Sequence, residues 1–184
     1  MRILAISGSL RRDSHNTKLV RAAAELLPPG VELDLWDGLK SMPPFDADEE
    51  ERPADSVLAL REAVALADAV LVATPEYNAS IPGVLKNALD WLSRPVRTSV
   101  LRNKPAAVIG ASTGMFGAVW AQAETRKVLA TIGARVVDRE LPVASADEQF
   151  GDDGALVDAD VRAALGEVLH ELVQESRAGE AIAA

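Results

Sequence analysis

Residues 8–17 hold the densest group of side chains that could do chemistry, in the order Gly-Ser-Leu-Arg-Arg-Asp-Ser-His-Asn-Thr. They follow a short apolar run and lead into a helical pattern, and a helix start offers an anion backbone N–H groups and the positive end of the helix dipole. Hydroxyl, amide and guanidinium side chains add further donors and positive charge. The predicted phosphate ligands in this loop are Ser9, Arg11, Ser14, Asn16 and Thr17. A capped loop with solvated arginines is the alternative interpretation.

The glycine spacing of this loop separates it from two common phosphate-binding motifs. The loop matches neither the G-x-G-x-x-G of dinucleotide-binding Rossmann domains nor the G-x-x-x-x-G-K-[ST] of P-loop NTPases. Both of those functions therefore lose their main support. A single terminal phosphate is the ligand that suits the loop better.

Two further loops follow other predicted strands. Residues 75–83 contain two prolines and a glycine, which impose a shaped turn that can present the Tyr77 ring and the Asn78 amide to a flat heteroaromatic ring. A rigid connection between a strand and a helix would explain the same residues. Residues 112–117 form a third loop, rich in small residues and ambiguous by itself. All three loops are expected at the carboxyl edge of one sheet, so together they favour a ligand site.

Hydrophobic patterns predict the elements that position these loops. Short, continuous apolar runs rich in branched residues are typical of buried parallel strands, and residues 31–36 alternate as a strand near a sheet edge does. Strands are predicted at residues 2–7, 31–36, 69–74, 106–111 and 135–141. Helices are predicted at residues 16–27, 54–66, 82–92, 118–132 and 158–175. This alternation predicts an α/β fold with a doubly wound, five-stranded parallel sheet in the strand order 2-1-3-4-5.

Length and composition bound the organisation of the chain. Its 184 residues suit a single domain, expected over residues 1–177, and residues 178–184 are expected to fray. The first residues lack the features of a secretory signal, and no uncharged apolar run approaches membrane-spanning length, so a cytoplasmic protein without a membrane partner is expected. The acidic residues 46–51 are expected to form a solvated loop rather than a metal site.

Charge and cysteine content argue against several function classes. Nineteen Lys and Arg against 28 Asp and Glu give a formal net charge of −9, which repels a polyanion, so no nucleic-acid partner is expected. The chain has no cysteine, and therefore no disulfide, thiolate nucleophile or Cys-ligated metal. His15, expected to be partly exposed in the phosphate loop, and His170, expected in solvent, make no credible zinc site. Any redox chemistry would need a bound organic cofactor.

With these motifs the sequence resembles the NADPH-dependent FMN reductase family, which includes quinone, azo and chromate reductases. The similarity spans most of the chain, and its first two motifs together are specific. The matching positions are residues 8–11 with Ser14 and Asn16, residues 75–78 with Ser80, Pro82 and Gly83, and residues 85–94, 104–105 and 112–117.

The resemblance implies a flavoprotein with a flavodoxin-like fold. FMN would be bound, NADPH or NADH would reduce it, and quinones, azo compounds or free flavin would accept the electrons. The FMN phosphate would be bound by Ser9, Arg11, Ser14 and Asn16. The isoalloxazine and ribityl region would contact Pro75, Glu76, Tyr77 and Asn78, and the remaining side would be lined by Ser112 and Gly114. Tyr77 and Asn78 are the predicted catalytic residues.

Two other functions share the predicted fold. A non-enzymatic electron carrier of the flavodoxin type is the first, although such carriers typically bind the phosphate with a loop of Thr, Ser and Gly that has no arginine. A regulatory domain that has lost the flavin is the second, because a fold alone does not determine a function.

A homodimer is expected, and a tetramer is also possible. The predicted helix at residues 82–92 carries more apolar residues than one stripe facing a sheet requires, so Trp91 and Leu92 are expected to face different partners. Packing of all these residues inside one subunit is the alternative. Lys86 and Asp90 are expected to form a surface ion pair on this helix. Residues 118–124 depart from the chromate and quinone reductase branch, because they lack the Arg and Tyr that link subunits there.

Overall fold

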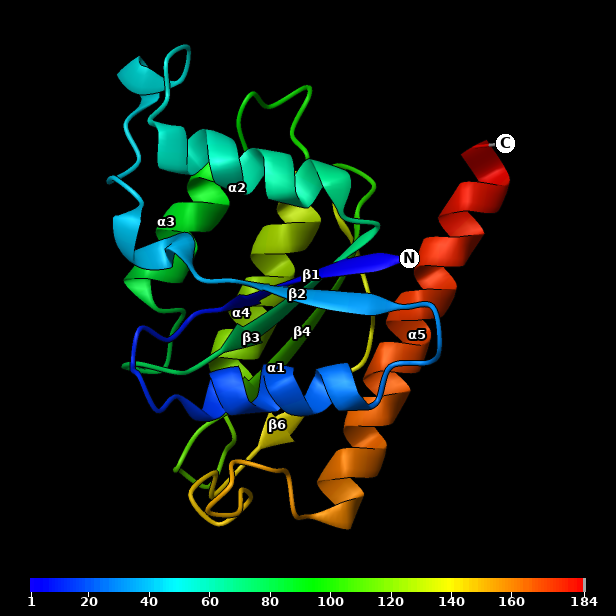
Figure 1. The fold of residues 1–184 in the computed structure, drawn as a ribbon. Helices are drawn as coiled ribbons and strands as arrows, with labels where there is room; N and C mark the ends of the chain where they lie inside the picture. The colour runs from blue at the N-terminus through cyan, green and yellow to red at the C-terminus, as the bar shows by residue number, and fades with distance from the viewer. Residues whose placement is uncertain (184) are drawn as a thin grey trace.

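Parallel strands form the centre of the protein (Figure 1). The computed structural model describes residues 1–183, and the side chains of residues 1–179. Its strands are β1 (Arg2–Ser7), β2 (Glu32–Trp36), β3 (Ala69–Thr74), β4 (Pro105–Ala111), β5 (Arg135–Val136) and β6 (Pro142–Val143). They follow the order β2-β1-β3-β4-β5, β6 also pairs with β4, and the pairings between these strands are parallel. The predicted fold class and strand order are therefore confirmed.

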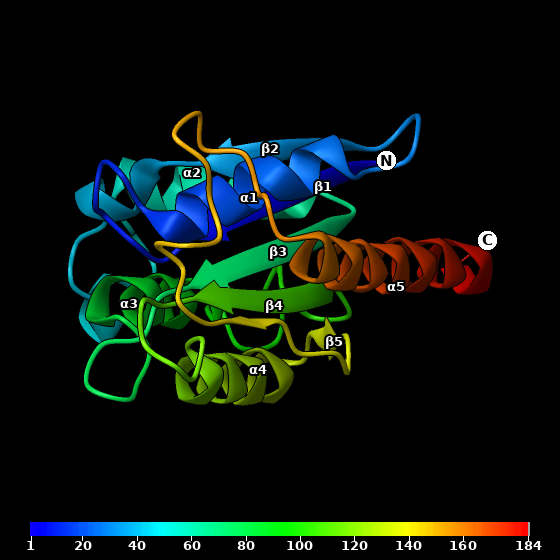
Figure 2. The same ribbon diagram turned by 90° about the horizontal axis from the view of Figure 1, so that it is seen from below.

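Helices connect the strands and cover both faces of the sheet. The α-helices are α1 (His15–Glu25), α2 (Asp55–Leu66), α3 (Gly83–Leu92), α4 (Val119–Ile132) and α5 (Ala159–Ala183). Two short 3-10 helices, η1 (Gly38–Ser41) and η2 (Ala47–Glu49), lie between β2 and α2. One face of the sheet packs against α1 and α5, and the other packs against α2, α3 and α4 (Figures 1 and 2). Apart from the end of α5, every predicted helix end lies within two residues of the observed one.

Two hydrophobic cores explain why the central strands are apolar throughout. Along β1, Ile3 and Ala5 belong to the core beneath α1 and α5, whereas Leu4 and Ile6 belong to the core beneath the other helices. Helices on both faces likewise bury every residue of β3 and β4. Because these strands are parallel, their carboxyl ends meet at one edge of the sheet, where the arrowheads of β3 and β4 point in Figure 2.

The prediction of one continuous fifth strand at residues 135–141 is wrong. Two short strands, β5 and β6, stand in its place and pair with opposite ends of β4. Between them the guanidinium of Arg126, on α4, donates hydrogen bonds to the carbonyls of Val137 and Arg139, each at 3.0 Å. These carbonyls accept hydrogen bonds from a side chain instead of from β4. The ladder of backbone hydrogen bonds along β4 is therefore interrupted between β5 and β6.

Two segments differ in shape from their predictions. The helix α5 continues to Ala183 instead of ending near residue 175. Fraying of residues 178–184 stays a prediction, and Ala184 lies outside the described residues. The acidic residues 46–51 are mostly exposed, as expected, although η2 gives part of this loop a helical turn.

The apolar residues of α3 pack inside the subunit. Trp91 and Leu92 do face different neighbours, but both neighbours belong to the same chain, so the prediction that one of these side chains meets a second subunit is wrong. Both side chains are completely buried. Trp91 donates a hydrogen bond from Nε1 to the Pro43 carbonyl at 2.9 Å, and its ring meets the edge of Phe45. The segment between β2 and α2 therefore covers the part of α3 that the sheet cannot reach.

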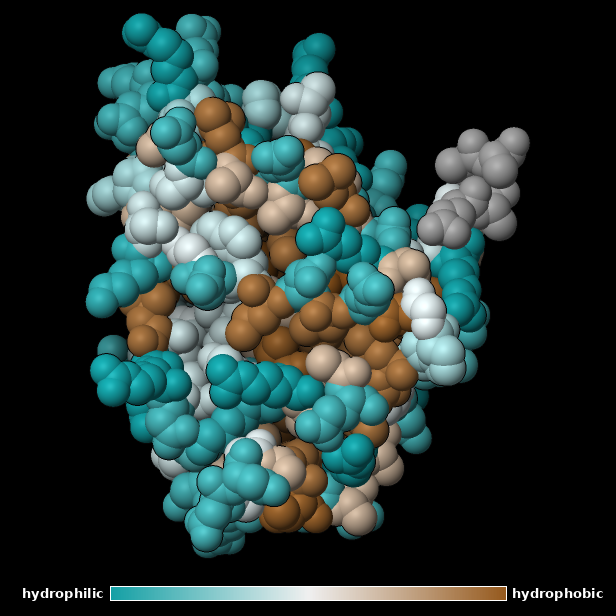
Figure 3. Space-filling view, viewed as in Figure 1, coloured by the Kyte–Doolittle hydropathy of each residue, from teal (hydrophilic) through white to brown (hydrophobic). Residues whose placement is uncertain are grey.

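The strand β2 forms one edge of the sheet, as its alternating pattern predicts. None of its residues is fully buried, and Leu35 is exposed. Figure 3 shows apolar side chains gathered on the face that carries this edge. Arg2 of β1 and Asp34 of β2 form an ion pair across the two strands. Charged side chains at an open edge discourage pairing with a second sheet.

Gly117, in the loop between β4 and α4, is required by both backbone conformation and space. Its φ is +55°, in the left-handed region. An added Cβ would lie 2.5 Å from the carbonyl carbon of Pro142 and 2.7 Å from the backbone nitrogen of Val143. Both atoms belong to the backbone of β6, so they cannot yield without moving that strand.

We expect Gly117→Ala to lower the free energy of unfolding by about 2–4 kcal/mol, because overpacking and the strained φ add together. Gly166→Ala is the matched control. An added Cβ at Gly166, within α5, meets nothing within 4 Å, and alanine favours a helix over glycine by about 1 kcal/mol. In denaturant unfolding, the free energy of unfolding should fall in Gly117→Ala and rise in Gly166→Ala. A Gly117 variant as stable as the wild type would contradict the argument.

Candidate functional site

The three predicted loops meet at the carboxyl edge of the sheet around a cavity of about 110 Å³. The cavity lies where the strand order reverses between β1 and β3, which is where doubly wound sheets bind ligands. Its lining residues are Ser9, Arg11, Ser14, His15, Asn16, Pro75, Glu76, Tyr77, Ala111, Ser112 and Thr113. Of the predicted site residues, Thr17, Asn78 and Gly114 lie outside this lining.

Ser14 begins α1 as its N-cap. Its buried hydroxyl accepts a hydrogen bond from the Thr17 N–H at 3.3 Å, and the Thr17 hydroxyl donates to Ser7 Oγ at 2.9 Å. The N–H groups of His15 and Asn16, in the first turn, have no acceptor within the helix. Ser14 and Thr17 therefore shape the start of α1, while its first N–H groups remain for a ligand.

Asn16 joins two parts of the site through its side chain. The residue is 3% exposed. Its Nδ2 donates to the Ala111 carbonyl and its Oδ1 accepts from the Ala111 N–H, both at 2.9 Å. This pair of hydrogen bonds ties the start of α1 to the end of β4. Both polar atoms of the Asn16 side chain are thus occupied, and the phosphate contact predicted for this residue would have to come from its backbone N–H group.

Arg11 lines the cavity and is exposed to solvent. Its backbone N–H donates to Ser9 Oγ at 3.4 Å, a weak contact that bends the loop. The nearby carboxylate of Asp13 pairs with Lys18 at 2.7 Å. Since Asp13 pairs with Lys18 rather than with Arg11, the Arg11 guanidinium is left available to an anion.

His15 is partly exposed, as predicted, and stacks on Phe150 with ring centroids 5.9 Å apart. Its Nδ1 is buried without a hydrogen-bond partner among the described residues. Burial lowers the pKa of His15, and the positive charges of Lys18 and Arg11 lower it further. The imidazole is therefore neutral at pH 7 and adds no charge to the cavity.

The loop after β3 forms a tight two-residue turn. Tyr77 and Ser80 exchange backbone hydrogen bonds in both directions, each at 3.2 Å. Asn78 and Ala79 between them have φ values of +54° and +58°, the left-handed values that a type I′ turn requires. Asparagine tolerates this conformation better than alanine does. The turn leaves Tyr77 48% exposed at the rim of the cavity.

Glu76 caps a helix from a different part of the chain. Its Oε2 accepts hydrogen bonds from the N–H groups of Trp120, at 3.0 Å, and Ala121, at 3.1 Å. These groups belong to the first turn of α4, whose own N-cap residue, Ala118, supplies no side-chain hydrogen bond. A carboxylate at this position is also favoured by the helix dipole. This oxygen is therefore occupied, and the flavin contact predicted for Glu76 would have to involve its other atoms.

Glu124, on α4, binds the same loop from the opposite direction. Its Oε2 accepts hydrogen bonds from the Ser80 hydroxyl, at 2.6 Å, and the Ile81 N–H, at 3.3 Å. These two donors, the hydroxyl first, lower the pKa of Glu124, so the carboxylate is ionised at neutral pH. Glu124 is not among the predicted site residues, because no motif links it to a serine 44 residues earlier.

The loop after β4 and the first turn of α4 carry exposed apolar side chains. Met115 is 75% exposed, Phe116 55% and Trp120 46%. The rings of Phe116 and Trp120 are in contact, with centroids 4.9 Å apart. Ser112 Oγ accepts a hydrogen bond from the Gly114 N–H at 3.1 Å, which shapes the start of this loop.

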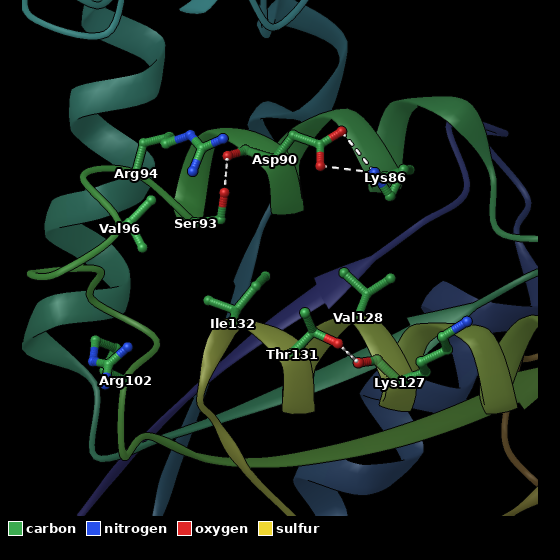
Figure 4. Close-up of a pocket in the computed structure, with 10 residues that line it drawn as sticks. All are labelled: Lys86, Asp90, Ser93, Arg94, Val96, Arg102, Lys127, Val128, Thr131 and Ile132. Atoms are coloured by element: carbon green, nitrogen blue, oxygen red, sulfur yellow. Dashed lines mark hydrogen bonds and ion pairs between the residues drawn. The ribbon is translucent and has the colours of Figure 1, made fainter.

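A second cavity, of about 390 Å³, lies between α3 and α4 (Figure 4). Val128 and Ile132 of α4 contribute apolar walls, and Lys86 and Asp90 of α3 form the predicted ion pair, with Nζ and Oδ1 2.7 Å apart. None of the lining residues belongs to the three loops described above. This cavity is therefore separate from the candidate site.

The described residues offer neither a metal site nor a membrane-spanning helix. Among the side chains that the structure describes, those of residues 1–179, no group of three or more His, Asp or Glu is arranged to hold a metal ion. Within residues 1–183, no helix has both the length and the apolar character needed to cross a membrane. His170 is exposed on α5, as predicted.

The chain is similar to known flavin and quinone reductases along most of its length. The sequence profile of the NADPH-dependent FMN reductase family matches residues 1–148. An NAD(P)H-dependent FMN reductase of Pseudomonas aeruginosa is 38% identical over 174 residues, which cover 94% of this chain and 93% of that protein. A 2-hydroxy-1,4-benzoquinone reductase of a Burkholderia species is 38% identical over 163 residues, which cover 88% of each chain.

A solved structure has the same arrangement of elements. FerB from Paracoccus denitrificans, described as a flavoenzyme NAD(P)H:(acceptor) oxidoreductase, matches with a TM-score of 0.85 and 34% identity. The match covers 97% of this chain and 98% of that one. Sequence and fold thus agree with the resemblance carried by the loop motifs, and the chain belongs to the NADPH-dependent FMN reductase family.

Proposed function

We propose that the protein is an FMN-dependent reductase that passes electrons from NADPH or NADH to small acceptors such as quinones, azo compounds or free flavin. The observation that supports this most strongly is the meeting of three loops where the strand order reverses. One loop supplies donors for a phosphate, and the other two carry exposed rings. The relatives named as an FMN reductase and a benzoquinone reductase point to the same chemistry.

The cavity fits the phosphate of FMN rather than the whole cofactor. Its volume of about 110 Å³ lies well below the roughly 300–1,000 Å³ of sites that enclose an entire ligand. The Ser9 hydroxyl, the Arg11 guanidinium and the start of α1 form the donor set that a phosphate prefers. We therefore propose that the phosphate binds in the cavity, and that the isoalloxazine contacts Tyr77 and Asn78. Pro75, Ser112 and Gly114 are proposed to line the remaining side.

The protein's part in the reaction is mainly orientation. When bound, FMN supplies the capacity to take a hydride from NAD(P)H and to pass the electrons on. Arg11 and the first N–H groups of α1 hold the phosphate, and the Asn78 turn offers its amide to the polar edge of the ring. His15 is neutral, so the site relies on position rather than on a charged proton donor.

Exposed aromatic side chains favour a flat acceptor. Tyr77 and Phe116 come from the loops after β3 and β4, Trp120 comes from the first turn of α4, and all three are roughly half exposed. The hydrogen bond from the Trp120 N–H to Glu76 joins the start of α4 to the loop after β3. Aromatic faces bind quinones and similar rings by offset stacking.

We also propose that the protein is a homodimer, with a tetramer as the alternative assembly. The large apolar side chains of α3, Trp91 and Leu92 among them, do not support this assembly, because they are buried within the subunit. Support comes instead from the exposed cluster of Met115, Phe116 and Trp120 beside the site. A two-fold contact through this cluster would bring each neighbour to the proposed acceptor pocket.

Arg11→Ala should weaken FMN binding by roughly tenfold to a hundredfold, or about 1.5–3 kcal/mol, because the guanidinium makes a charge-assisted contact with the phosphate. Isothermal titration of the FMN-free protein measures the change. Arg12→Ala is the matched control, since Arg12 is equally exposed and does not line the cavity. Riboflavin, which has no phosphate, should bind both variants alike. Unchanged FMN affinity of the Arg11 variant would contradict the assignment.

Anaerobic stopped flow tests the enzyme activity directly. NADPH should bleach the bound flavin rapidly, whereas an electron carrier would react slowly and a flavin-free domain would bind no FMN. Asn78→Gly should slow this step and shift the flavin spectrum, with little change in stability, because glycine keeps the left-handed backbone while removing the amide. Wild-type rates in this variant would exclude a catalytic role for Asn78.

Sedimentation at micromolar concentration should give a dimer. Phe116→Glu should shift the protein towards monomer, because a carboxylate would have to be buried at the contact. Leu58→Glu, at a similarly exposed site on α2, should leave the dimer intact. A monomeric wild type with full reductase activity would refute the proposed assembly.

A further inference from the structure

Two carboxylates join the loop after β3 to α4, one from each direction. Glu76, which precedes the turn, accepts from two N–H groups of α4. Glu124, on α4, accepts from the hydroxyl of Ser80, which ends the turn, and from the N–H of Ile81, which follows it. Both ends of the turn are therefore fixed to one helix. We call these two sets of contacts the carboxylate clasp.

The turn needs support from outside. Its own hydrogen bonds are the two between Tyr77 and Ser80, at 3.2 Å, and a short hairpin of this kind is marginal in water. Asn78 and Ala79 both have positive φ, and alanine pays a steric cost of about 1–2 kcal/mol there. Left alone, the turn would therefore sample other conformations.

The two carboxylates serve different elements. Glu76 satisfies N–H groups that α4 would otherwise leave without partners, so its contact supports the helix. Glu124 lies inside α4, and both of its hydrogen bonds go to the loop. The shorter of them, 2.6 Å from the Ser80 hydroxyl, has the length of a charge-assisted bond. Glu124 therefore acts on the turn rather than on its own helix.

We propose that Glu124 is a positioning residue, which holds the turn at residues 77–80 in the shape that presents Tyr77 and Asn78 to the flavin. The clasp itself is a property of the chain without cofactor. Its effect on the flavin rests on the proposed function. Glu124 would thus act through the loop to which it is hydrogen-bonded, without touching the reacting atoms.

Amide hydrogen exchange of the FMN-free protein tests the clasp. In Glu124→Ala the Ser80 and Ile81 amides should exchange at least about tenfold faster, because a charged acceptor is lost. Glu124→Gln should show a smaller effect, since a neutral amide oxygen can still accept. Glu62→Ala, at an exposed glutamate on α2, is the control and should leave both rates unchanged.

A rescue variant separates positioning from general destabilisation. Ala79→Gly removes the steric cost of positive φ, so in the Glu124→Ala background it should restore protection at Ser80, whose acceptor is Tyr77. It should not restore protection at Ile81, whose acceptor is Glu124 itself. FMN affinity and the spectrum of bound flavin should change together with the protection of the Ser80 amide. In Glu124→Ala the affinity should fall and the spectrum should shift, and in the double variant both should return towards the wild type.

Three results would overturn the proposal. The first is wild-type exchange at both amides in Glu124→Ala. The second is faster exchange spread evenly over the chain. The third is faster exchange at the turn with unchanged FMN affinity and flavin spectrum. A wild type that binds no FMN would instead refute the proposed function, while exchange at Ser80 and Ile81 would still decide whether Glu124 holds the turn.

Discussion

The hydrogen bonds between Asn16 and Ala111 are the contact on which the site depends. The register of β3 with β4 ends at the pair Thr74 and Gly110, so Ala111 has no strand partner on that side. The Asn16 amide bonds both backbone groups of Ala111 and takes the place of the missing strand. Leaving buried backbone groups unpaired would cost about 1–3 kcal/mol each. The start of α1 and the loop after β4 therefore keep a constant relative position, which a phosphate site between loops requires.

The helix α4 organises the rest of this edge through its side chains. Gln122, fully buried, donates to the Gly117 carbonyl and accepts from the Leu141 N–H. Glu124 binds the loop after β3, and Arg126 binds the carbonyls between β5 and β6. Loops and a broken strand thus find their hydrogen-bond partners on one helix. This arrangement satisfies backbone groups where a regular ladder has ended.

Aromatic residues are scarce in this chain, and several of the few lie at the site. The chain has three Trp, one Tyr and three Phe. One of each kind is about half exposed: Tyr77 on the loop after β3, Phe116 on the loop after β4 and Trp120 in the first turn of α4. The main cores are filled instead by aliphatic side chains and alanine. Leaving these rings exposed forgoes the stability that their burial would add to the fold. Exposed rings of this kind are typical of a surface that binds a flat ligand or a second subunit.

Sequence alone determined the class of fold, the strand order and the loops of the site, because hydrophobic periodicity and turn residues are local signals. Even the edge position of β2 followed from alternation. Other features depended on contacts between distant residues. The amide of Asn16 turned inward to Ala111, Arg126 divided the fifth strand, and Trp91 was covered by the segment around Pro43. Glu124 has no local signal at all. Only the tertiary structure decided these roles, since a polar or aromatic side chain bonds whichever partner folding brings within reach.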